Sequence, residues 1–182
     1  MHLDYNGPYL ASEETYMAAT VSTITIPVGT KAFFVLMGSA TKKIRVTRIH
    51  MSGLTLTASA YNMISMRKIS SIPSGGTTTA LTKTSLDSAL SNSTASLCQM
   101  YTVEPTTDGT LVGTIQSQKI LMQDTVAKAG DPNTEIYFNL KPLESSSGVI
   151  LRGINEGITA ALATSPATAV TLSLEVEWSE ID

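Results

Sequence analysis

Cysteine, histidine and tryptophan are almost absent from this sequence. Cys98 is the only cysteine, so no disulfide can form within the chain, and this argues against a disulfide-stapled secreted scaffold. The two histidines, His2 and His50, have no neighbouring motif that would complete a zinc site or a catalytic triad. No apolar run is long enough for a transmembrane helix, so we expect no membrane contact. At 182 residues, the chain can bury about 70% of its unfolded surface without a disulfide or a metal.

Charge is scarce as well. Charged residues make up 15% of the chain, against about a quarter in typical proteins, and Ser and Thr take their place. The net charge of −3 gives no overall attraction to nucleic acid, so no direct nucleic-acid contact is expected. The first ten residues lack the charged and apolar regions of a secretory signal, so we expect the cytoplasm, or a particle assembled there.

The charges that are present are unevenly distributed. No acidic residue lies between Glu14 and Asp87, and the chain ends in an acidic segment from Glu175 to Asp182. Two interpretations remain open: basic early strands paired with acidic late strands, or a basic face that docks on an acidic partner. The basic residues of the early stretch are Lys31, Lys42, Lys43, Arg45, Arg48, Arg67, Lys68 and Lys83.

The end of the chain carries the clearest structural pattern. Apolar and polar residues alternate without a break over residues 170–178, which places all the apolar ones on one face of a strand. A helix would scatter them around its circumference, so the segment is predicted to be a long strand with one buried face. The apolar residues are Val170, Leu172, Leu174, Val176 and Trp178.

About nine or ten strands separated by turn signals are expected in all, and no stretch predicts a convincing amphipathic helix. This pattern indicates an antiparallel β-sandwich or a barrel, and spacing does not choose between a jelly roll and an immunoglobulin-like order. In residues 43–51 the apolar positions change face, which predicts a β-bulge near Thr47 and Arg48. A second bulge or bend is expected near Asn62. Residues 70–79 have the composition of a loop, and residues 84–95 could hold a short helix or turn.

The first eighteen residues differ from the rest. They hold Tyr5, Tyr9 and Tyr16 and show no period of two, so we predict an extended arm over residues 1–18, with a helical turn between Ala11 and Ala19. A single β-sandwich domain would then occupy residues 19–182. Tyrosine offers a large contact area at little entropic cost, so an arm of this kind is suited to binding a neighbour.

No group of residues predicts a chemical site. Cys98 lies in an apolar strand and is expected to be a buried, inert thiol. Gly75 and Gly76 are not followed by the Lys and Ser or Thr of a phosphate loop. Asp131 lies in a turn that lacks the ligand spacing of a calcium loop. We therefore expect no catalytic residue, no metal, no cofactor and no enzymatic activity.

Several stretches, in order, resemble a group of small bacteriophage structural proteins, and the likeness covers nearly everything after residue 20. The resemblance implies a small all-β virion component, similar to the jelly-roll decoration or cement proteins of phage heads. The stretches are residues 38–49 (GSATKKIRVTRI), 75–82 (GGTTTALT), 101–102 (YT), 113–115 (GTI), 149–153 (VILRG) and 174–180 (LEVEWSE).

This resemblance implies a partner and a location. The expected partner is the major capsid protein, the expected location is the capsid surface of the virion, and a homo-oligomer, dimer or trimer, fits such sites. The three tyrosines of the arm would lie along a neighbouring subunit, and a basic segment would face an acidic capsid surface. That segment consists of Lys42, Lys43 and Arg45.

A second class of function remains open. The chain could be a binding module of a tail, collar or fibre that recognises a host glycan or another virion protein. A sugar site normally exposes an aromatic platform, and Trp178, the only Trp, is predicted to point inward with Val176.

Overall fold

The computed structural model describes residues 14–56, 60–124, 135–140 and 148–182. Over these residues the chain forms thirteen strands and no helix, which confirms the all-β prediction. The strands are more numerous than the nine or ten expected. The strands are β1 Glu14–Ala19, β2 Ile24–Ile26, β3 Ala32–Met37, β4 Lys43–Leu56, β5 Ala60–Ile69, β6 Thr77–Ala80, β7 Lys83–Ser85, β8 Leu97–Val103, β9 Leu111–Asp124, β10 Glu135–Asn139, β11 Val149–Leu151, β12 Gly157–Leu162 and β13 Val170–Ile181.

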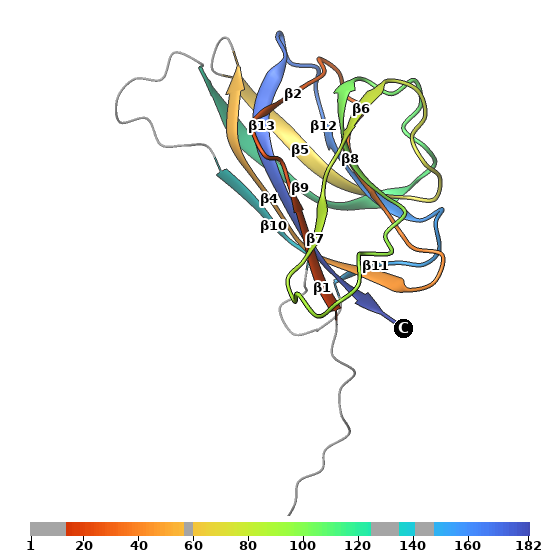
Figure 1. Ribbon diagram of the computed structural model, residues 1–182. Coiled ribbons are helices and arrows are strands. Elements are labelled where there is room, and N and C mark those ends of the chain that lie inside the picture. Colours follow the sequence, from red (N-terminus) through yellow and green to blue (C-terminus); the bar gives the residue numbers. More distant parts are fainter. Residues whose placement is uncertain (1–13, 57–59, 125–134, 141–147) are drawn as a thin grey trace, which may run out of the picture.

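Two antiparallel sheets pack together as a β-sandwich (Figure 1). Sheet A has the order β7-β1-β13-β4, with β2 on the start of β13 and with β10 and β11 both on the outer edge of β4. Sheet B has the order β6-β8-β3-β12-β5-β9. A short parallel pairing of β4 with β9, at Thr55 and Leu56, joins the sheets at one corner. The sandwich is as predicted, and its jelly-roll character stays a prediction.

The core lies between the two sheets. The final strand has the predicted alternation, since Val170, Leu172, Leu174, Val176 and Trp178 are all buried, and it continues to Ile181. Burying a large apolar side chain contributes about 1.5–3 kcal/mol, so this single face is a substantial part of the driving force for folding. Strand β3 is buried at each of its residues, so both of its faces lie within the protein.

The predicted β-bulge is present in β4. Glu177 of β13 lies opposite Arg48, and the next residue, Trp178, lies opposite Val46, so Thr47 is the extra residue. The extra residue reverses the alternation, and Ile49 therefore returns to the same buried face as Val46.

The second predicted bend is misplaced. The ladder between β5 and β9 runs without a shift from Ala60 to Met66, so no bulge occurs at Asn62. The interruption comes earlier, because β4 ends at Leu56 in sheet A and β5 begins at Ala60 in sheet B. The chain changes sheets there, and a change of sheet resembles a bulge when only the alternation of side chains is read.

The predicted arm is corrected over residues 14–18. These residues belong to β1, which pairs with β13 on one side and with β7 on the other, so the helical turn expected there is absent. Residues 1–13, including Tyr5 and Tyr9, lie outside the described residues. The threonine-rich end of the predicted loop, Thr77–Ala80, is strand β6 because it pairs with β8. No described segment forms a helix that could span a membrane.

Candidate interaction surfaces

Tyr16 is part of the core and not of a surface. The residue is fully buried, and its ring stacks on Trp178 at a centroid distance of 6.1 Å. Its hydroxyl lies 3.0 Å from the Ser91 carbonyl oxygen and 3.0 Å from a Glu14 carboxylate oxygen, and either of them can accept its one proton. The prediction that Tyr16 contacts a neighbouring subunit is therefore wrong, because the strand pairing of β1 turns this ring into the sandwich.

The basic segment at the start of β4 is engaged within the chain. Lys42 Nζ lies 2.6 Å from a Glu14 carboxylate oxygen, and Lys43 Nζ donates to the Asp182 carbonyl at 2.6 Å. The hydrogen bond with Lys42 is the largest cause of the lowered pKa of Glu14. Arg45 is half-buried on the same strand. Contact of Lys42, Lys43 and Arg45 with an acidic capsid surface stays a prediction, and the lysines would have to exchange partners to make it.

The interpretation of paired basic and acidic strands is confirmed. Along the ladder of β4 and β13, His50 lies opposite Glu175, and Arg48 lies opposite Glu177. Arg48 Nη2 is 2.7 Å from Glu175 and 3.4 Å from Glu177. The Thr47 hydroxyl donates to Glu177 Oε1 at 2.9 Å, so the bulge residue also belongs to this network.

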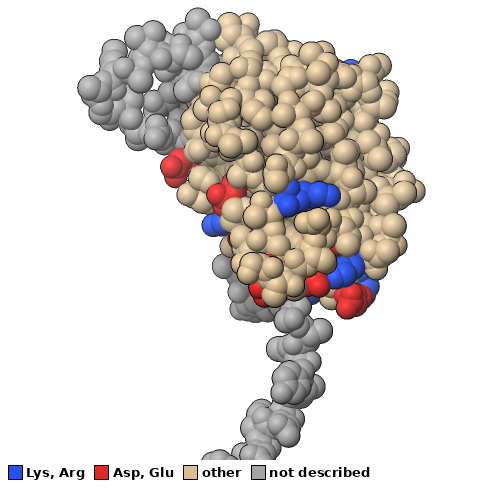
Figure 2. Space-filling view, in the orientation of Figure 1, with Lys and Arg blue, Asp and Glu red and all other residues tan. Residues whose placement is uncertain are grey.

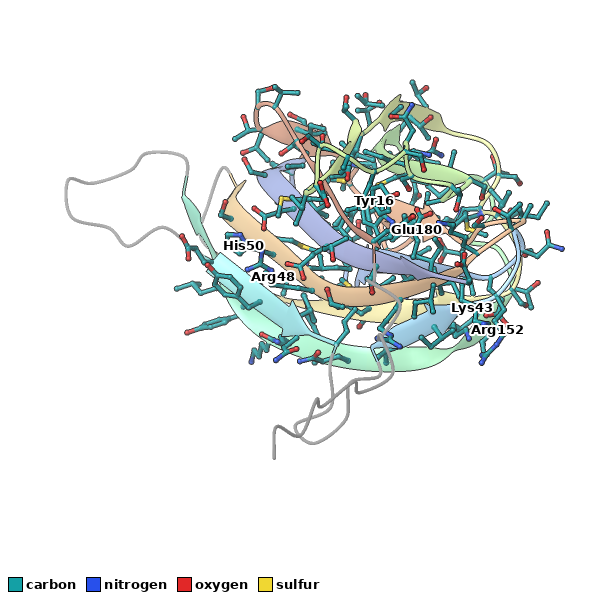
Figure 3. All side chains as sticks on the ribbon, turned by 60° about the horizontal axis from the view of Figure 1, so that its bottom comes forward. Tyr16, Lys43, Arg48, His50, Arg152 and Glu180 are labelled. Atoms are coloured by element: carbon teal, nitrogen blue, oxygen red, sulfur yellow. The ribbon has the colours of Figure 1, made fainter. Side chains whose placement is uncertain are left out.

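Strand β10 adds an aromatic ring to this network. Tyr137 lies opposite His50 and stacks on it, with ring centroids 4.1 Å apart and planes 9° apart. Desolvation raises the pKa of Tyr137, and nearby Glu135 adds to the rise, so the phenol stays protonated at neutral pH. In Figure 3, Arg48 and His50 project from neighbouring positions of β4, away from the buried pair Tyr16 and Glu180.

Two surface hollows adjoin the stacked rings. The Nε2 atom of His50 is buried and lacks a hydrogen-bond partner within the described part of the chain. One hollow is lined by Thr47, Arg48, Tyr137, Asn139 and Glu177. The other is lined by residues that include Thr20, His50, Ser52, Ser173 and Glu175. The outer face of sheet A therefore holds donors, acceptors and an aromatic ring close together.

A different surface is almost free of charge. Three segments, residues 20–30, 77–80 and 163–169, contain no Asp, Glu, Lys or Arg. They meet at one end of the sandwich, because β2 pairs with the start of β13 and also contacts β8, the strand with which β6 pairs. Figure 2 shows this end largely free of blue and red, with most of the visible charge lower on the molecule. We call these three segments the neutral end.

The neutral end is polar but exposes some apolar area. Val21 and Val28 are exposed, and every residue of β6 is exposed. Gly76, directly before β6, has φ of 75°, and a Cβ there would lie 2.4 Å from the Val103 carbonyl oxygen. The turn into β6 therefore needs glycine.

The structure also places the residues considered for chemistry. Cys98 is buried, and burial raises the pKa of its thiol to about 12. In the described ranges, no three His, Cys, Asp or Glu side chains come close enough together to hold a metal ion. Residues 131–133 lie outside the described residues.

Sequence reasoning missed the role of Tyr137 and Asn139. Residues 135–139 alternate in character, and the apolar Ile136 and Phe138 of this pattern are buried. The same alternation leaves Tyr137 and Asn139 exposed, but the pairing of β10 with β4 is a long-range contact that no local pattern specifies.

Comparison with known proteins gives little more. No protein-family model matches the chain, and no curated protein matches it. A similar solved chain is described as "Structure of infectious bursal disease virus Gt strain", with 12% identity and a TM-score of 0.21, over 100% of this chain. This chain spans 45% of the length of that one. Such a TM-score does not establish a shared fold, so the β-sandwich rests on the strand pairing described above.

Proposed function

We propose that this protein is a non-enzymatic structural component of a bacteriophage virion, which binds the outside of the capsid shell as a decoration or cement protein. The motifs after residue 20 that resemble small phage structural proteins support the virion setting. The jelly-roll form of the sandwich, the major capsid protein as partner, and a homodimer or homotrimer are parts of the same proposal.

The observation that carries the proposal is the neutral end. Burying a charge at an interface is costly unless it is paired, and the centres of protein interfaces are depleted of charged residues. Three segments far apart in the sequence, none with a charged residue, supply most of this surface, and the Glu104 carboxylate beside Gly29 accepts a hydrogen bond from the Lys31 amide. This is the described surface best suited to extensive contact with another protein.

The mechanism would be mass action. A protein that binds the assembled shell, and not its separated subunits, shifts the equilibrium toward the shell. Repetition of the same contact on a symmetric lattice multiplies weak affinities. Residues 1–13, with Tyr5 and Tyr9, would add a second contact along a neighbouring subunit.

Pelleting with phage heads tests this proposal. The purified full chain would be mixed with expanded heads that lack it, and the bound copies would be counted after sedimentation. We expect hundreds of copies per head, and a marked loss of binding when charges are placed at the neutral end by Thr25→Glu with Thr78→Glu. A matched control is Thr114→Glu, an exposed threonine on β9.

Two results would contradict the proposal. A dozen or fewer copies per particle would indicate a vertex or tail component. Unchanged binding of the double variant, with loss in the β9 control, would show that another surface makes the contact.

A further inference from the structure

The hollow beside Tyr137 combines the chemical groups that recognise a sugar. We propose that the outer face of sheet A binds a neutral oligosaccharide there, with one sugar ring on Tyr137 and hydroxyl groups bonded to Arg48 and Glu177. This site is separate from the neutral end, so the proposal does not depend on capsid binding.

The aromatic ring supplies the apolar contact. His50 covers one face of the Tyr137 ring, and 51% of the tyrosine is exposed, which leaves the other face available to a ligand. The Gln118 side chain donates to the Tyr137 carbonyl at 2.7 Å, which ties this part of β10 to β9. A sugar presents C–H groups on one face, and a ring held in place loses little entropy on contact.

The polar groups beside the ring can satisfy adjacent hydroxyls. Arg48 reaches both glutamates through Nη2 alone, and a guanidinium carries five N–H donors. A carboxylate offers about four acceptor positions, and Glu177 uses one oxygen for Thr47 and the other for Arg48. A hydroxyl both donates and accepts, so it can bond to an arginine and a glutamate that lie side by side.

The charges select against other ligands. Three carboxylates, from Glu135, Glu175 and Glu177, surround Arg48 and His50, so an anionic ligand would be repelled. The position that a cation would take between Glu175 and Glu177 is already filled by Arg48. A neutral polyol needs no net charge and is the ligand class that fits best.

The length of the surface favours more than one sugar unit. The second hollow lies at His50 and Glu175, two residues along each strand from Arg48 and Glu177, or roughly 7 Å away. It is lined by His50 and Glu175 together with the hydroxyl-bearing Ser52 and Ser173. A second sugar unit would lie there and bond to the two hydroxyl groups and to the Glu175 carboxylate.

Titration of the full chain with defined saccharides tests the proposal. Chitotetraose, maltohexaose and lacto-N-tetraose are the neutral probes, 3′-sialyllactose is the anionic probe, and a Lys-rich peptide is the cationic probe. We expect at least one neutral probe to bind and to shift the Tyr137 ring signals in the NMR spectrum. Tyr137→Ala should weaken this binding roughly tenfold or more, since it removes the stacking surface.

Two further variants serve as controls. Tyr137→Phe keeps the ring and should retain binding. Tyr61→Ala removes a tyrosine of similar exposure from β5 in sheet B and should leave binding unchanged. If Tyr137→Ala does not fold, the wild-type ring signals decide, because they shift on saccharide addition only if the sugar reaches Tyr137.

Four results would overturn the proposal: no binding of any neutral probe at millimolar concentration, equal binding by folded Tyr137→Ala, unmoved Tyr137 ring signals, or tighter binding of sialyllactose or the peptide. Pelleting with phage heads uses neither Tyr137 nor a saccharide. Failure here is therefore distinguishable from failure of the capsid proposal.

Discussion

At the scale of single residues, Glu180 holds a loop against the core. Its carboxylate lies 2% exposed at the end of β13 and accepts hydrogen bonds from the Ser93 and Thr94 hydroxyls, at 2.6 Å each, and from the Thr94 amide. Burial by itself would raise the pKa of Glu180, but these hydrogen bonds and one from Trp178 outweigh it, and the pKa is lowered. The ionised carboxylate thus holds the segment before β8 against sheet A.

Replacement of this carboxylate should be costly. Glu180→Gln puts an amide among donors and should lower the free energy of unfolding at pH 7 by about 1–3 kcal/mol. Because the folded-state pKa is below the ordinary value of 4.5, this stabilisation is complete above that value and is lost as the pH falls through the folded-state pKa. Urea unfolding of wild type and Glu180→Gln from pH 7 to pH 3 should therefore show that the difference in their free energies of unfolding becomes smaller as the pH falls.

The control for this prediction is an exposed glutamate. Glu135→Gln, whose side chain is 47% exposed, should change the free energy of unfolding only slightly. A gap between Glu180→Gln and wild type that stays constant below pH 4.5 would contradict the assigned role of the carboxylate.

At the scale of elements, the bulge in β4 decides which side chains enter the core. Val46 and Arg48 lie opposite two consecutive residues of β13, so Thr47 between them has no opposite residue. With it, Ile44, Val46 and Ile49 all face inward. Within this strand the apolar residues change from even to odd positions. That change was sufficient to predict the bulge, because the side-chain period of a strand is two.

Deletion of Thr47 should therefore be far worse than its substitution. Without the extra residue, either the first or the second half of β4 turns its apolar side chains to solvent, at about 3 kcal/mol or more. Thr47→Val keeps the register and loses the hydrogen bond to Glu177, at about 1 kcal/mol. Thermal unfolding compares the two, and a deletion variant as stable as Thr47→Val would show that the bulge does not set the register.

The same reasoning explains where prediction from sequence fell short. Strand β13 was recognised because alternation is a local signal, and β3, β8 and β10 carry a local signal of the same kind, either alternation or a bounded apolar run. Strand β1 was not, since the residues around Tyr16 show no such period, and its pairing with β13 joins the two ends of the chain. Residues 77–80 have the composition of a loop, and they form strand β6 because they pair with β8.

At the scale of the whole molecule, the reactivity of Cys98 measures how often the sandwich opens. The thiol is buried, and burial raises its pKa to about 12, so the reactive thiolate is scarce in the folded protein at pH 8. A disulfide reagent can then label Cys98 only when the fold opens.

Labelling with Ellman's reagent should accordingly be slow in native buffer and immediate in denaturant. The rate should rise with urea in parallel with unfolding, as followed by Trp178 fluorescence. Complete labelling within minutes in native buffer would mean that the region around β8 opens independently of the rest.

Local patterns in the sequence were enough to predict the class of the fold, the direction of most side chains, the bulge at Thr47 and the lack of a disulfide within the chain. Those follow from composition and from the period of two, which neighbouring residues set among themselves. Long-range contacts make Tyr16 a core residue, give Lys42 and Lys43 partners within the chain, and bring three uncharged segments together in one surface. Such contacts also place Tyr137 on His50 beside Arg48. Pairing between distant strands places these residues, and such pairing depends on how the whole chain buries its apolar faces.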